Sequence, residues 1–195
     1  MSQPITNRSF LLYSWSLVLA AFASSINPAV AQDTAEPAIK AVADIQYLPS
    51  KIAFGSCSNQ NKPQPILDTV VAKNPDLFIY LGDNIYGDTE DMEVLAQKYR
   101  KLENKKEFQN LRANTAVLST WDDHDYGCND AGKEYAFKKA SKEIFMNFWN
   151  VPLSSPRRKH PGIYGSHTFS DGKKTLQVLL LDTRTFRDPL KQNSE

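Results

Sequence analysis

Two acidic clusters, about forty residues apart, constrain the fold of this chain more than any other feature. The first is Leu81–Asp88 (LGDNIYGD) and the second is Thr120–Tyr126 (TWDDHDY). Each follows an apolar, strand-like run, Leu77–Leu81 in one case and Ala116–Leu118, leading to Trp121, in the other. Unpaired carboxylates at the end of a buried strand are costly, whereas metal ions stabilise them. With a Cys-bearing turn upstream, the two clusters indicate a metal-dependent hydrolase.

The N-terminus has the three-part layout of an export signal. Arg8 precedes the apolar run Phe10–Ala23, and Ala29–Ala31 offers a cleavage sequence of small residues. We therefore expect residues 1–31 to be a signal peptide and the protein to be exported, periplasmic or extracellular. An uncleaved membrane anchor is the alternative, but the apolar run of about 14 residues is shorter than the roughly 20 that a helical span needs. No transmembrane span is expected after cleavage.

Composition adds two constraints on the rest of the chain. The 23 basic and 22 acidic residues balance to a net charge of +1, which gives no reason to expect a nucleic-acid-binding surface. Residues 32–49 are expected to be a flexible lead-in to a domain over residues 50–195. In an oxidising compartment Cys57 and Cys128 can form a disulfide, so a disulfide and a metal-ligand role compete for Cys57.

The apolar patterns predict an α/β domain. A strand over 51–54, a helix over 65–73 and a strand over 77–81 form a βαβ unit, which should be parallel. Further helices, a third strand and a hairpin are expected along the rest of the chain, with a loop before the hairpin. These are a helix over 91–102, a short helix around Phe108 and Leu111, a strand over 116–121, a helix over 133–149, a loop over 152–161, and hairpin strands over 163–169 and 175–181.

The predicted site lies at the carboxyl ends of these strands, where open α/β sheets bind ligands. Asp83 is suited to bridge two ions, because a carboxylate offers two oxygens. Tyr86 and Cys57 can supply phenolate and thiolate to a ferric ion, and Asp123 can serve a second ion. His124 is the predicted catalytic residue, which contacts the phosphate or protonates the leaving group.

The neighbouring polar residues are expected to support the site. Of the three acids of the second cluster at most two can bind metal, and Asp123 is preferred to Asp122, while the others should bond backbone amides. Asp88 is expected to be a turn residue or a cap. Asn84 and Asp122 are outer contacts of the site, and Arg184 either pairs with Asp182 or contacts substrate phosphate.

Four motifs carry a family resemblance. Phe54–Cys57 (FGSC), Leu81–Asp88, Trp121–Asp125 (WDDHD) and Leu180–Arg184 (LLDTR) occur in order and resemble those of the PhoD-like alkaline phosphatases, in the calcineurin-like metallophosphoesterase superfamily. The similarity runs from about residue 50 to 190.

The resemblance implies a layered β-sandwich flanked by helices, incomplete at the C-terminus. It implies a phosphatase or phosphodiesterase that hydrolyses phosphate esters by a metal-activated hydroxide. The binuclear or multinuclear site would hold Fe³⁺ with Ca²⁺, or else Mn²⁺, Mg²⁺ or Zn²⁺. By motif, Asp83, Tyr86, Asp123 and Cys57 match metal ligands and His124 the catalytic histidine. The family's further histidine and acidic ligands have no matching motif here, so the alternative is a truncated, non-catalytic metal-binding remnant.

Overall fold

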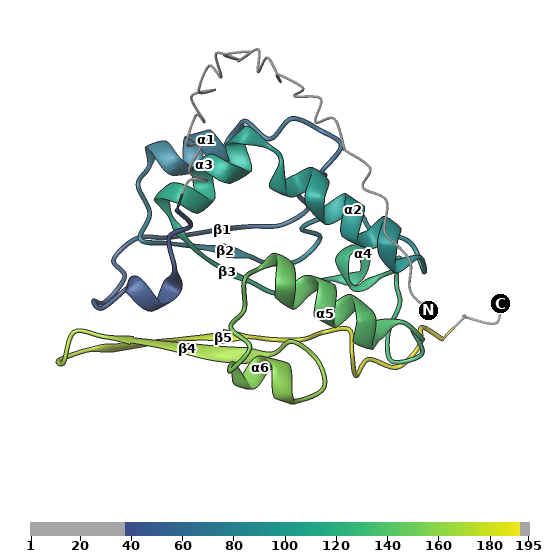
Figure 1. Ribbon diagram of the computed structural model, residues 1–195. Coiled ribbons are helices and arrows are strands. Elements are labelled where there is room, and N and C mark those ends of the chain that lie inside the picture. The colour runs from purple at the N-terminus through teal and green to yellow at the C-terminus, as the bar shows by residue number, and fades with distance from the viewer. Residues whose placement is uncertain (1–37, 192–195) are drawn as a thin grey trace, which may run out of the picture. The chain divides into compact units, whose positions relative to one another are not determined.

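The computed structural model of the chain describes residues 38–191 (Figure 1). The predicted signal peptide over residues 1–31 lies outside this range, as do residues 32–37 of the predicted lead-in. Among the described residues, no helix combines the length and the apolar character needed to cross a membrane.

The described chain is a mixed α/β structure with two small sheets. The elements follow one another as η1 (Val42–Asp44), β1 (Ile52–Gly55), α1 (Ile66–Ala72), β2 (Leu77–Tyr80), α2 (Met92–Glu103), α3 (Lys106–Asn114), β3 (Ala116–Ser119), α4 (Asp123–Tyr126), α5 (Lys138–Phe148), α6 (Pro156–Lys159), β4 (Gly165–Ser170) and β5 (Thr175–Leu180). One sheet has the order β1-β2-β3 and the other is the β4-β5 hairpin. Both pairings in the first sheet are parallel and the hairpin is antiparallel, which confirms the predicted parallel unit and hairpin.

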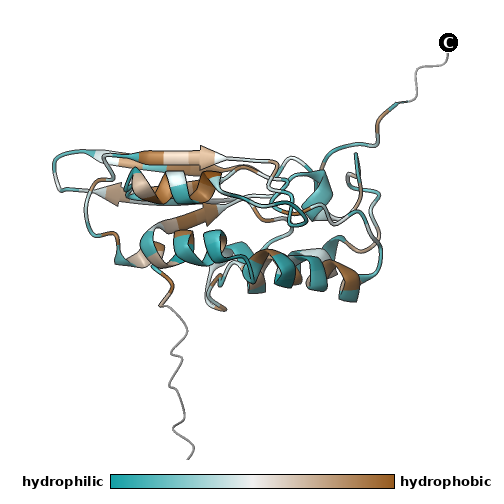
Figure 2. Ribbon diagram, turned by 90° about the horizontal axis from the view of Figure 1, so that it is seen from above, coloured by the Kyte–Doolittle hydropathy of each residue, from teal (hydrophilic) through white to brown (hydrophobic). Residues whose placement is uncertain are grey.

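The central strand β2 is buried along most of its length. Leu77, Phe78 and Tyr80 are all buried, as its unbroken apolar sequence predicts for a strand covered on both faces. Figure 1 shows α1, α2 and α3 on one side of the sheet and the hairpin on the other. In Figure 2 the strands are largely brown, and the outward faces of the helices largely teal.

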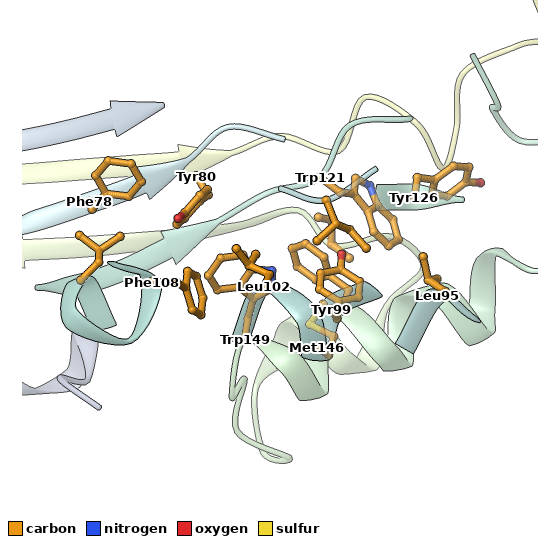
Figure 3. Close-up of a cluster of buried hydrophobic side chains, with 14 of the residues drawn as sticks. Phe78, Tyr80, Leu95, Tyr99, Leu102, Phe108, Trp121, Tyr126, Met146 and Trp149 are labelled. Carbon is orange, nitrogen blue, oxygen red and sulfur yellow. The ribbon is translucent and has the colours of Figure 1, made fainter. Parts of the chain in front are cut away.

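Two apolar clusters cover the two faces of the sheet. The larger joins β2 to the helices and is rich in aromatic rings, for example Tyr80 and Trp149, whose ring centroids are 5.1 Å apart (Figure 3). The smaller joins the opposite face to the hairpin through residues such as Leu77, Leu118, Phe169 and Leu180. The hairpin is thus fixed to the sheet by apolar burial, which holds the end of β5 near the end of β3.

Two predicted elements differ from the structure. The helix predicted over 133–149 begins only at Lys138, since residues 133–137 form turns, in which the amide of Tyr135 bonds the carbonyl of Gly132 at 3.0 Å. The loop predicted over 152–161 contains α6, whose Arg157 side chain is buried and donates to the carbonyls of Ser119 and Ile163 at 2.9 and 2.8 Å. A basic side chain there serves the fold and is not a solvated loop charge.

Candidate metal centre

The three parallel strands end in register at one edge of the sheet, and the turns that follow them lie side by side. The amide of Cys57 donates to the carbonyl of Gly82 at 3.2 Å, and the amide of Ser58 donates to that of Asp83 at 2.8 Å. Cys57 and Asp83 both have positive φ, 59° and 51°, in the left-handed region that most residues avoid. Such strained residues gather at functional sites.

The two acidic clusters, Leu81–Asp88 and Thr120–Tyr126, form the first and second acidic turns. Two glycines allow the first turn to lie directly against the second. A Cβ on Gly82, where φ is 115°, would lie 2.7 Å from the Cβ of Asp122. A Cβ on Gly87 would lie 2.5 Å from the carbonyl oxygen of His124, which accepts a 2.9 Å hydrogen bond from the Gly87 amide. The backbones of the two turns are therefore in contact, and neither glycine can carry a side chain without moving them apart.

The buried side chain of Asp125 links the two turns. Its fully buried carboxylate accepts hydrogen bonds from the amides of Asp122, Asp83 and Asn84 at 2.7, 3.3 and 3.2 Å. Asn84 is also fully buried and donates its side-chain amide to the carbonyl of Thr120 at 2.8 Å and to Asp125. Of the two acids expected to bond backbone amides, Asp125 does so, whereas the side chain of Asp122 bonds Nε of Arg184. Asn84 is a structural bridge between the turns.

Asp83, Asp123 and His124 converge on one point. One ligand atom from each lies within 4.8 Å of the others, a spacing that could hold a metal ion. Oxygen Oδ1 of Asp83 is buried and has no hydrogen-bond partner among the described residues, although a buried polar atom normally has one. The two carboxylates are of the kind that divalent and ferric ions bind, and the imidazole lies beside them. The residues present therefore fit a metal ion.

The other two predicted ligands lie beside this group. The thiol of Cys57 is 3.6 Å from Oδ2 of Asp83, and the ring of Tyr86 lies over that of His124 with centroids 4.4 Å apart. Burial raises the pKa of the Tyr86 phenol, and the neighbouring Cys57 and Asp83 raise it further. Cys57 and Cys128 are both free thiols, so the alternative that they pair is not what the structure contains. Ligation by Cys57 and by Tyr86 stays a prediction.

Asp88 contributes to the site in a way that the sequence did not indicate. Its two carboxylate oxygens lie 2.7 and 2.8 Å from Nδ1 of His124. The helix cap next to it is Asp91, which accepts from the amides of Glu93 and Val94 at 2.9 and 3.2 Å. Burial lowers the pKa of His124, but the hydrogen bond and charge of Asp88, together with the charges of Asp83 and Asp123, outweigh this and leave that pKa raised. Asp88 is therefore a partner of His124 and not a cap.

Arg184 reaches the second acidic turn from the end of the hairpin. Its Nε bonds Oδ1 of Asp122, and its terminal nitrogen lies 3.6 Å from Oδ1 of Asp123. The predicted pairing with Asp182 is wrong for the side chain, since Asp182 accepts the backbone amide of Arg184 at 3.0 Å instead. The other oxygen of Asp123 accepts from the amide of Asp130 at 2.7 Å. The apolar packing of the hairpin against the sheet thus positions the Arg184 guanidinium at this turn.

The two candidate carboxylate ligands have opposite electrostatic environments. Burial raises the pKa of Asp83, and the charges of Asp122 and Asp123 raise it further, while His124 opposes them. Burial also raises the pKa of Asp123, but the Asp130 amide and the Arg184 guanidinium outweigh it, and that pKa is lowered. Asp123 therefore has a guanidinium that favours its charged form, whereas the His124 imidazole and the Cys57 thiol do not offset the burial and the acidic neighbours of Asp83.

Acids and a histidine thus gather at the strand ends of a parallel sheet, the edge at which open α/β sheets bind ligands. The family model of the PhoD-like phosphatases matches residues 52–195, and the chain belongs to this family. A solved structure titled "Structure of PhoD" is similar in fold, with a TM-score of 0.57 and 20% identity over 74% of this chain. The chain spans 33% of that protein's length. The comparison with curated proteins gave no match.

Proposed function

We propose that this chain forms the first part of an exported, metal-dependent phosphatase or phosphodiesterase that hydrolyses phosphate esters. The observation that carries the proposal is the convergence of Asp83, Asp123 and His124 from two strand ends. Membership of the PhoD-like phosphatase family supports phosphoester chemistry, and the sequence of residues 1–31 supports export to the periplasm or beyond.

The residues that would hold metal are the predicted ligands. Asp83 would bridge two ions, with Cys57 and Tyr86 binding a ferric ion and Asp123 binding a second ion. We infer that the second ion is Ca²⁺, with Mn²⁺, Mg²⁺ or Zn²⁺ as the alternatives. Bound ions of this kind polarise a phosphoryl group and lower the pKa of water. Asp83 has a buried oxygen free for such a role.

We propose that His124 acts on the leaving group. Because Asp88 occupies Nδ1, the imidazole has its Nε2 left for the substrate, and the carboxylate fixes the orientation of the ring. The raised pKa of His124 favours its protonated form, which can donate a proton to a departing alkoxide. The dyad therefore supports a role in leaving-group protonation.

The layered packing supports the architecture that we propose for the whole domain. The sheet has apolar clusters on both faces, one toward the helices and one toward the hairpin. A β-sandwich flanked by helices follows if the hairpin belongs to a second, larger sheet.

Activity of the full chain on a chromogenic phosphate ester, with added iron and calcium, tests the proposal. We expect turnover that Asp83→Asn abolishes together with metal binding. Asp68→Asn is the control, because it removes a remote acid of α1 that accepts a bond from Asn110 at 2.9 Å. An inactive wild type whose metal content Asp83→Asn leaves unchanged would contradict the proposal.

A non-catalytic metal-binding remnant is the second candidate. The chain spans a third of the related solved protein's length, and the histidines after Asp125 do not join the metal group. His160 stacks on Tyr164 with centroids 3.9 Å apart, and His167 lies within β4. Elemental analysis that finds one bound ion, without turnover, would favour this candidate.

A further inference from the structure

The two carboxylates of the candidate metal centre, Asp83 and Asp123, differ in how many contacts their oxygens make with other protein groups. On the first turn, Oδ1 of Asp83 is buried without a partner among the described residues, and Oδ2 has only the thiol of Cys57 at 3.6 Å. On the second turn, both oxygens of Asp123 have partners. Oδ2 accepts a hydrogen bond from the Asp130 amide at 2.7 Å, and Oδ1 forms an ion pair with a terminal nitrogen of Arg184 at 3.6 Å. One carboxylate is open to a cation and the other already has one.

The cation on the second turn is firmly held. The side chain of Arg184 is only 15% exposed, and that of Asp123 only 10%. A guanidinium binds two carboxylates with a fixed fork of donors, and here Nε contacts Asp122 while the terminal nitrogen faces Asp123. Partial burial reduces the screening of this ion pair by solvent and salt.

The backbone that carries Arg184 is also fixed. Asp182, just after β5, accepts hydrogen bonds from the amides of Arg184 and Thr185 at 3.0 and 2.9 Å. The same carboxylate accepts from the indole of Trp121 at 3.0 Å and from the amide of Ile163 at 2.8 Å. Since Trp121 directly precedes Asp122, Asp182 connects the backbone of Arg184 to the turn that its guanidinium contacts.

We infer that Arg184 is an internal cation that competes with the second metal ion for Asp123. The centre then has two unequal positions: one at Asp83 that accepts an ion directly, and one at Asp123 that fills only when the guanidinium moves away. A metal ion and a guanidinium held within a few ångströms repel each other strongly in a partly buried site. This inference rests on the proposed metal centre and adds the residue that controls its occupancy.

Titration of the metal-free full chain with Mn²⁺, with binding read from the loss of the free-ion paramagnetic resonance signal, tests the inference. We expect the wild type to bind one ion tightly and a second at least tenfold more weakly. Arg184→Gln should tighten the second step about tenfold and leave the first within about twofold. Arg184→Lys keeps the charge but loses the fork, so it should tighten the second step by a smaller factor in the same direction.

The matched control is Arg100→Gln. It removes a positive charge from α2, where Arg100 is 53% exposed and pairs with Glu93 at 2.6 Å, and it should bind Mn²⁺ as the wild type does. Circular dichroism establishes that each variant is folded. If Arg184→Gln does not fold, Arg184→Lys decides the question alone.

Three outcomes overturn the inference. One is a folded Arg184 variant whose second step is unchanged, another is two equal steps in the wild type, and the third is equal tightening by Arg100→Gln. Asp83→Asn separates this failure from that of the proposed function. If the wild type binds no Mn²⁺, or binds it independently of Asp83, the metal centre itself is wrong. If the tight step depends on Asp83 but the weak step is unaffected by substitution of Arg184, only the proposed competition between Arg184 and the second ion is wrong.

Discussion

The amide of Gly87 donates a 2.9 Å hydrogen bond to the carbonyl oxygen of His124, and this bond joins the two acidic turns. It requires the backbones to touch, since a Cβ on Gly87 would lie 2.5 Å from the same oxygen. The chemistry-bearing side chains of the two turns can converge only because this residue has no side chain. The acids and the glycines of the first motif therefore form one structural unit.

Gly87→Ala should separate the turns. The added methyl group cannot fit at 2.5 Å from backbone, so the turn must shift, and we expect a loss of roughly 1–3 kcal/mol of stability, as for other overpacked sites, together with weaker metal binding. Gly55→Ala is the control, because its Cβ would lie 3.5 Å from Phe78, an ordinary contact. Thermal denaturation and metal titration measure both effects. Equal behaviour of the two variants would contradict this account.

Asp125→Ala should be more destabilising than the loss of any exposed acid. It would leave the amides of Asp122, Asp83 and Asn84 without their acceptor, and each unsatisfied buried group costs about 1–3 kcal/mol. We expect the free energy of unfolding, measured with urea, to fall by at least about 3 kcal/mol. Asp68→Ala, on the exposed face of α1, should change it little. A small loss for Asp125→Ala would mean that water replaces the carboxylate.

Helices, strands and turns that are encoded by a short stretch of sequence were predicted correctly. The apolar run of β2, the helical spacing of α2 and the turn between β4 and β5 each carry their own signal, and the structure has all three. Adjacent ends of parallel strands were enough to predict that Asp83, Asp123 and His124 lie together. These predictions needed only chain direction and burial.

The pairs that the sequence did not reveal are long-range. Asp88 meets His124 across 36 positions and Arg184 meets Asp122 across 62. Both contacts depend on how tightly the turns and the hairpin pack, which is set by glycines and by apolar clusters rather than by the charged residues themselves. An acid near another acid, such as Asp88 near Asp91, resembles a helix cap when only the local sequence is considered.

Asp88→Asn should lower turnover of a phosphate ester about tenfold or more, because His124 loses the carboxylate that orients its ring. In a double-mutant cycle, Asp88→Asn should have little further effect once His124 is replaced by Asn, since the two residues act as a unit. Glu90→Gln, an exposed acid two positions further on, is the control. Steady-state kinetics at saturating substrate measures the effect, and additive losses in the cycle would argue against a shared role.

Asp182 should make the fold sensitive to acid. Burial raises the pKa of this carboxyl, but hydrogen bonds from Thr185, Trp121 and Ile163 outweigh it, and the pKa in the folded chain is lowered. A group with a depressed folded pKa stabilises the fold above its unfolded pKa of about 3.9, and this stability is lost as pH falls through the folded value. The melting temperature of the wild type should therefore drop more between pH 5 and pH 3 than that of Asp182→Asn, which is less stable at pH 7. Parallel curves for the two proteins would show that these hydrogen bonds do not favour the charged form.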